Sequence, residues 1–215
     1  MVKYCKFQVQ HLNFFLLSEF KLIHKYIPKA SISLVEGLLR KYKFYLIIKN
    51  NRKTKHGDFR PLPNGIMQIT INNDMNEYRF LITFVHEVAH LVTHKKHKRV
   101  KPHGIEWKLH FQELMLPFFK PAIFPKELMP ILANYMRNPK ASTDSDIQLS
   151  YALKQFDEKS DKNYIFEIPL HTKFIHNNKV FVRGEKRRVR YKCMELKSKR
   201  EYLFHPNAEV DLLED

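Results

Sequence analysis

Three side chains near the middle of the chain have the types and the spacing needed to hold and use a metal ion. They lie in residues 80–94, which read FLITFVHEVAHLVTH. His86 and His90 are four residues apart, so on a helix both imidazoles project from one face and can reach a single cation. Glu87 is rotated by about 100° from His86 and flanks that cation without binding it. The pattern HExxH pairs two zinc ligands with a general base.

The surroundings of this motif favour the metal interpretation. Most other residues of the segment are apolar and fall on all sides of the helical wheel, which indicates a buried helix. Burying imidazoles and a carboxylate is costly unless a partner compensates each group. The chain has 12 histidines, so a chance match is the alternative, but chance would rarely place the match inside an apolar helix.

A third ligand is needed, because a catalytic zinc is typically held by three protein ligands and one water. His103 is the preferred candidate, since it opens the segment HGIEWKLHF. There Gly104 permits a sharp turn into a second helix, and Trp107 can pack that helix against the first. Glu106 is the alternative ligand in the same segment.

HEVAH followed by HGIEW resembles the SprT family of zinc metalloproteases, which includes the Spartan-type proteases. The likeness is good over residues 30–116, where RKTKHGDFRPLPNGIMQITINNDMN is similar to the family's β-hairpin. The resemblance implies an α+β, zincin-like (minigluzincin) core with a small antiparallel sheet. It also implies that His86, His90 and His103 hold one Zn²⁺, and that Glu87 activates the zinc-bound water to hydrolyse a peptide bond. In zincins the strand beside this helix usually receives the substrate by strand addition.

The C-terminal region departs from the family pattern. Many bacterial SprT proteins end in a zinc ribbon built on two CxxC-like pairs, whereas this region holds only Cys193. Because a four-cysteine site needs four thiolates, we expect no second zinc there and a degenerate module that folds by apolar contacts.

The composition predicts a globular protein with one domain and a small module. With 215 residues and 44% hydrophobic content, the chain can bury a core. We expect a metalloprotease domain over 1–140, a linker with a short helix over 141–160, and a basic β-rich module over 161–215. Two cysteines give no disulfide framework, and the chain has no signal-like or membrane-spanning stretch, so we expect a cytoplasmic protein that could associate with the nucleoid. We also expect a monomer.

A formal net charge of +16 favours a polyanionic partner, and for an intracellular chain nucleic acid is the first choice. Two clusters of cations carry this prediction, with Tyr191 beside the second as a residue on which a base could stack. The predicted nucleic-acid contacts are Lys95, Lys96, Lys98, Arg99, Lys186, Arg187, Arg188 and Arg190. The alternative is a solvated basic surface, or in the module a charged strand edge that resists aggregation.

The elements that must position these residues follow from periodicity. We expect helices over 8–26, 31–41, 104–116, 126–138 and 147–156, and strands over 43–49 and 66–71 joined by a polar connection over 50–64. Ser33 and Glu36 have the spacing of a capping box, and Asn73 or Asp74 can start the central helix region. The module should contain strands over 164–168, 179–183, 189–194 and 201–204.

Three functions are compatible with this pattern. The first is a zinc peptidase, and its Spartan-type resemblance implies that its substrates could be DNA-bound or DNA-crosslinked proteins. The second is a non-catalytic nucleic-acid-binding protein with a structural zinc, closed by Glu106 or His94 as a fourth ligand. The third is hydrolysis of another amide. We otherwise expect His94 and His97 to be exposed loop residues, and no membrane partner.

Overall fold

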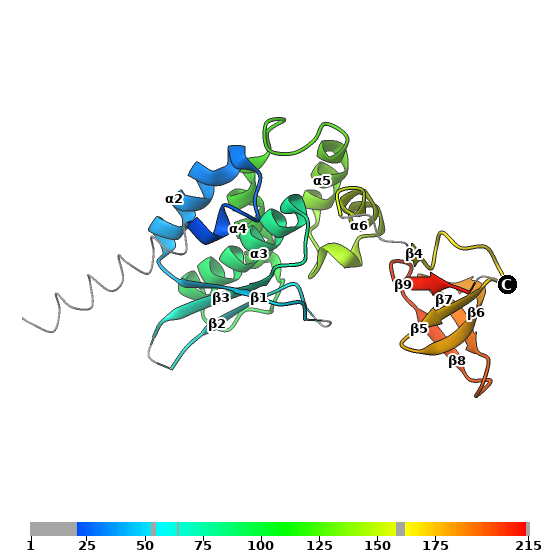
Figure 1. Ribbon diagram of the computed structural model, residues 1–215. Helices are drawn as coiled ribbons and strands as arrows, with labels where there is room; N and C mark the ends of the chain where they lie inside the picture. Colours follow the sequence, from blue (N-terminus) through cyan, green and yellow to red (C-terminus); the bar gives the residue numbers. More distant parts are fainter. Residues whose placement is uncertain (1–20, 53–54, 64, 158–161, 214–215) are drawn as a thin grey trace, which may run out of the picture. The chain divides into compact units, whose positions relative to one another are not determined.

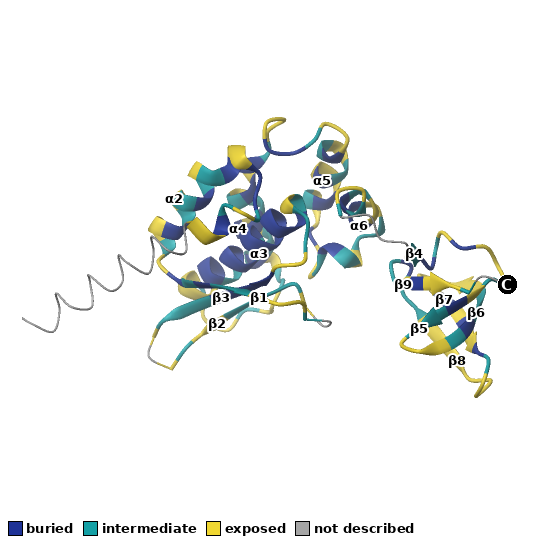
Figure 2. Cartoon of the chain, in the orientation of Figure 1, coloured by how far each residue is buried: buried dark blue, intermediate teal, exposed yellow. Residues whose placement is uncertain are grey.

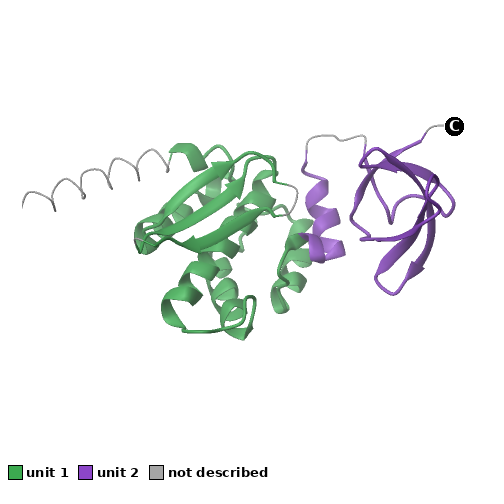
Figure 3. Cartoon of the chain, turned by 90° about the horizontal axis from the view of Figure 1, so that it is seen from below, with its two compact units in different colours: residues 1–143 green, residues 144–215 purple. Residues whose placement is uncertain are grey.

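The computed structural model describes residues 21–52, 55–63, 65–157 and 162–213. It is a mixed α+β protein with two sheets, as expected, and it divides into units of residues 1–143 and 144–215 (Figure 3). The first unit contains η1 (Lys29–Ser31), α2 (Ile32–Tyr42), β1 (Tyr45–Lys49), β2 (Gly57–Pro61), β3 (Met67–Asn72), α3 (Glu77–Lys96), α4 (Ile105–Met115), η2 (Leu116–Phe118) and α5 (Leu128–Arg137). The boundary falls within η3 (Thr143–Ser145).

The sheet of the first unit has the order β1-β3-β2, with its helices on one face (Figure 1). β3 is central, parallel to β1 and antiparallel to β2, so this sheet is mixed and the predicted antiparallel sheet is wrong for the β1–β3 pair. Residues 50–64 are therefore not only a connection, because they contain β2, which forms a hairpin with β3. The expected alternation along β3 is also incomplete: Thr70 is buried together with Ile69 and Ile71, since a central strand is covered more fully than an edge strand.

Helix α3 forms the core of the first unit. It is buried along most of its length, as Figure 2 shows, and its fully buried side chains include Phe80, Phe84 and Val88. Asn76 caps its first turn by accepting hydrogen bonds from the backbone amides of Tyr78 and Arg79. The helix therefore begins later than the predicted start at Asn73 or Asp74.

The two smaller helices beside α3 match their predicted positions, with one difference. Trp107 of α4 is 1% exposed, which confirms that it packs α4 against its neighbour. In α2 the predicted capping box does not form, because Ser33 lies inside the helix and Glu36 contacts His24 and Arg40 instead. The helix predicted over 8–26 lies mostly outside the described residues.

The second unit contains α6 and an antiparallel sheet of order β4-β9-β5-β6-β7-β8. Its elements are α6 (Ile147–Lys154), β4 (Asn163–Tyr164), β5 (Lys173–His176), β6 (Lys179–Arg187), β7 (Arg190–Glu195), β8 (Glu201–Phe204) and β9 (Glu209–Leu212). The strand predicted over 164–168 is wrong beyond Tyr164, since the chain turns there. A small core including Phe174, Phe181 and Cys193 forms the centre of the unit.

Among the described residues, no helix is both long enough and apolar enough to cross a membrane. α3 is the longest, and polar side chains interrupt its apolar surface.

Candidate metal centre

The three predicted metal ligands meet at one point in the first unit. The Nε2 atom of His90 lies 3.1 Å from that of His86 and 2.9 Å from that of His103, and the third separation is 3.2 Å. With Zn–N bonds near 2.0–2.1 Å, two imidazoles on a tetrahedral ion have nitrogens roughly 3.3–3.4 Å apart. The spacing of the triad is therefore close to that of three ligands sharing one ion, and the group could hold a metal ion.

The chemistry of the donors also fits a cation. A neutral imidazole has one N–H, so three Nε2 atoms in mutual contact leave unshared lone pairs facing one another. Burial lowers the pKa of His86 well below its usual value and that of His90 to about 4, and the other imidazoles add to both shifts. Burial likewise lowers the pKa of His103. All three rings are thus neutral near pH 7 and can donate lone pairs to a metal.

Two different segments bring these ligands together. His86 and His90 share one face of α3, while His103 lies in the loop before α4 with a left-handed φ of 56°. Trp107 holds the arrangement from α4: its ring stacks on that of His90 at 5.2 Å, and its Nε1 donates to the backbone oxygen of His86 at 3.4 Å. Phe111 then stacks on Trp107 at 5.1 Å, so stacked aromatic rings support the histidine triad.

The predicted general base lies between α3 and the edge strand β2. Glu87 is 6% exposed, and burial raises the pKa of its carboxyl to about 8, with the charge of Asp58 adding to the shift. A hydrogen bond from the backbone of Phe59 acts in the opposite direction. A cation held by the neighbouring histidines would also favour the ionised carboxylate.

Gly57 is a site residue that sequence reasoning missed. A Cβ atom added there would lie 2.5 Å from Oε1 of Glu87 and 2.8 Å from its Cγ. The carboxylate therefore occupies the space that any larger residue would need. The only local signal is a glycine within a polar segment, which is equally typical of a turn.

The described residues add no fourth histidine, cysteine or carboxylate to the triad. Glu106 lies in the first turn of α4, with its Oε2 near Gly104, and His94 packs its ring against Phe59 at 5.6 Å. Three ligands with an open position are typical of catalytic zinc, whereas structural zinc is usually closed by four.

The residues predicted to contact nucleic acid lie on two exposed segments. Lys95, Lys96, Lys98 and Arg99 surround the end of α3, where Lys95 Nζ donates to the backbone oxygen of Tyr42 at 3.0 Å. The other four cations, Lys186, Arg187, Arg188 and Arg190, are exposed at the tip of the β6–β7 hairpin in the second unit.

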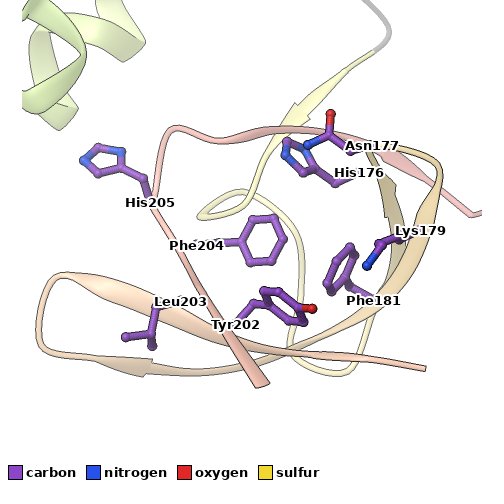
Figure 4. Close-up of a pocket in the computed structure, with 8 residues that line it drawn as sticks. All are labelled: His176, Asn177, Lys179, Phe181, Tyr202, Leu203, Phe204 and His205. Carbon is purple, nitrogen blue, oxygen red and sulfur yellow. The ribbon is translucent and has the colours of Figure 1, made fainter. Parts of the chain in front are cut away.

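The aromatic residue expected beside this second cluster is not available for stacking. Tyr191 is 8% exposed, and the guanidinium of Arg183 covers its ring at 4.4 Å. Accessible aromatic surface lies instead in a hollow of about 470 Å³, where Figure 4 shows the exposed Tyr202 and the half-buried Phe204 beside the buried Phe181. Alternation along β7 explains the error, because Tyr191 faces the core while its neighbours face solvent.

Comparisons with protein-family models, curated proteins and solved structures returned no match for this chain. Its function must therefore be argued from the chemistry of the site.

Proposed function

We propose that this protein is a zinc-dependent metallopeptidase with a zincin-like catalytic unit, similar to the SprT proteases. The supporting observation is the convergence of His86, His90 and His103, with no fourth ligand among the described residues and a buried carboxylate on the adjacent helix position. Three neutral imidazoles suit zinc among the common divalent cations. The open position is what separates this proposal from a structural zinc site.

Each site residue has a defined role in peptide hydrolysis. Zinc bound to the triad would lower the pKa of a coordinated water and polarise the substrate carbonyl. Glu87 accepts the proton of the attacking water and then delivers it to the leaving amine. Trp107 and Phe111 keep the histidine rings oriented, so that the geometry does not reorganise during the reaction.

Strand β2 is the best candidate to receive an extended substrate. It is an edge strand, paired only with β3 among the described strands, and its backbone contacts Glu87 through Phe59. A peptide added along its free edge would gain main-chain hydrogen bonds and lie beside the general base. Hydrolysis of a non-peptide amide would need no such strand, so cleavage of extended peptides tests this assignment.

The Gly57→Ala variant should lose about a hundredfold in peptidase activity, because displacement of a catalytic group by about 1 Å can cost that much. Its new methyl group would meet the Glu87 side chain at 2.5–2.9 Å. The backbone at Gly57 has no positive φ, so alanine causes no strain of its own. Steady-state kinetics on zinc-loaded protein should show the loss in kcat, with zinc content unchanged.

Gly37→Ala is the matched control, since nothing lies within 4 Å of the Cβ atom that it would add in α2. Wild-type kcat in the Gly57 variant would show that the carboxylate is not held in place by this contact.

Nucleic-acid binding is a second function, favoured by the exposed cations of the β6–β7 hairpin and by the aromatic hollow of the same unit. In a peptidase, nucleic-acid binding would direct the enzyme to DNA-bound or DNA-crosslinked proteins. A protease assay on a DNA-binding protein, with and without DNA and with a chelator control, tests the combination. Cleavage that requires metal but does not change when DNA is added would support the peptidase proposal. It would contradict the proposal that DNA-bound proteins are the substrates.

Affinity of the full chain for a single-stranded oligonucleotide should fall about 50-fold between roughly 50 and 200 mM salt if four cations contact phosphates. Fluorescence anisotropy measures this directly. In a plot of log affinity against log salt concentration, the double variant Arg187→Ala/Arg188→Ala should make the slope less steep by about 1.4. Arg137→Ala on α5 should leave the slope unchanged. Salt-independent binding would contradict an interface made of these side chains.

A further inference from the structure

A second pair of histidines repeats the contact between His90 and His103. Seven residues after each of them come His97 and His110, whose Nε2 atoms lie 3.3 Å apart. This separation equals that of two imidazoles on a tetrahedral ion, roughly 3.3–3.4 Å. Two helical turns advance the chain by about 10 Å, so one ion cannot serve both pairs.

The carboxylate of Glu113 lies where it could accept a hydrogen bond from the second ring nitrogen of a metal-binding histidine. Oε2 of Glu113 lies 3.3 Å from Nδ1 of His110, on the side of the ring away from His97. Metal-binding histidines usually donate their second ring N–H to a carboxylate or carbonyl, which fixes the tautomer and raises ligand basicity. His110 is 8% exposed, so its ring is held in one place before any ion arrives.

There is space for the remaining ligands of an ion. A hollow of about 300 Å³ lies on the His110 side of the pair, and its lining includes Glu113, Lys41, Lys96 and several apolar side chains, but not His97. Waters could complete the coordination from this side. Lys41 and Lys96 are exposed, so solvent screens their repulsion of a cation, and the carboxylate of Glu113 offsets it in part.

We propose that His97 and His110 bind a second divalent transition-metal ion, with Zn²⁺ as the probe and Glu113 orienting His110. Imidazole nitrogens suit zinc, copper and nickel, and two protein ligands predict weaker binding than at the triad. The ion would fasten the end of α3 to α4 and so anchor the loop that carries His103. The site shares no residue with the triad and does not depend on the proposed peptidase activity.

The test is the zinc content of the full chain after dialysis at about 10 μM free Zn²⁺, which fills a site of micromolar dissociation constant. We expect about two ions per wild-type chain, about one in His97→Ala and about two in His94→Ala, a nearby exposed histidine as control. His90→Ala should instead lose the ion of the triad, so the two sites can fail separately.

His97 is half-buried at the end of α3, so its replacement should not prevent folding, whereas loss of the buried His110 could. A single ion in the wild type, or a second ion that persists in His97→Ala, would overturn the proposal. In that case the 3.3 Å contact is a hydrogen bond between a protonated and an unprotonated nitrogen.

Discussion

Replacing Glu87 by glutamine should reduce peptide cleavage by about 10²–10⁴-fold, the usual contribution of general acid–base catalysis. Glutamine keeps the size of the side chain and its fit against Gly57, but it cannot accept a proton from water. The loss should therefore appear in kcat, with zinc content and melting temperature close to wild type. Single-turnover cleavage of a fluorogenic peptide, on protein freed of metal and reloaded with one equivalent of zinc, measures it.

The glutamine variant also separates the two zinc-containing alternatives. If the zinc were structural and the chain non-catalytic, purified wild type and variant would show the same background cleavage. A fall in zinc content in the variant would place Glu87 among the ligands, which the geometry of the triad opposes.

Removing a ligand should have a different result from removing the base. His90→Ala takes away the imidazole that contacts both other members of the triad, at 3.1 and 2.9 Å. We expect activity to fall by about a thousandfold or more, because a catalytic zinc supplies several kcal/mol of transition-state stabilisation. Wild type should gain about 2.7 kcal/mol of unfolding free energy at zinc a hundredfold above its dissociation constant, and the variant should gain much less.

Thermal denaturation with and without zinc measures this gain, and inductively coupled plasma mass spectrometry measures the bound metal. His94→Ala provides the control, since it removes a histidine of the same helix that is exposed and lies outside the triad. An equal zinc-dependent stabilisation of His90→Ala and wild type would show that the main zinc site is elsewhere.

Most of the histidine triad could be predicted from the sequence because the information for it is local. A spacing of four residues brings His86 and His90 to one face of any helix, and the apolar surroundings indicate where that helix is buried. The prediction of His103 depended on the second motif and on the family resemblance, since the loop between His90 and His103 has no periodicity. The structure brings all three together.

The environment of Glu87 could not be predicted in the same way. Its contacts come from Gly57 and Phe59, about 30 residues earlier, in a segment whose charges and prolines are typical of a loop. Strand β2 is an edge strand with a partly exposed surface, so it lacks the apolar alternation that marks a buried strand. Long-range pairing with β3, and not local propensity, makes this segment a strand.

In the second unit the strands that were missed are short. β5 and β9 have four residues each, too few to show a period of two above the background of a basic sequence. Tyr191 shows the opposite error, because its place in a basic cluster suggested exposure while the pleat of β7 directs it into the core.

A crystal structure of the zinc-loaded protein, with anomalous data collected at the zinc absorption edge, tests the metal centre most directly. We predict an anomalous peak within about 2.1 Å of Nε2 of His86, His90 and His103, and a water in the fourth position. A protein side chain in that fourth position, or histidine rings turned away from a common ion, would contradict the catalytic role proposed for the site.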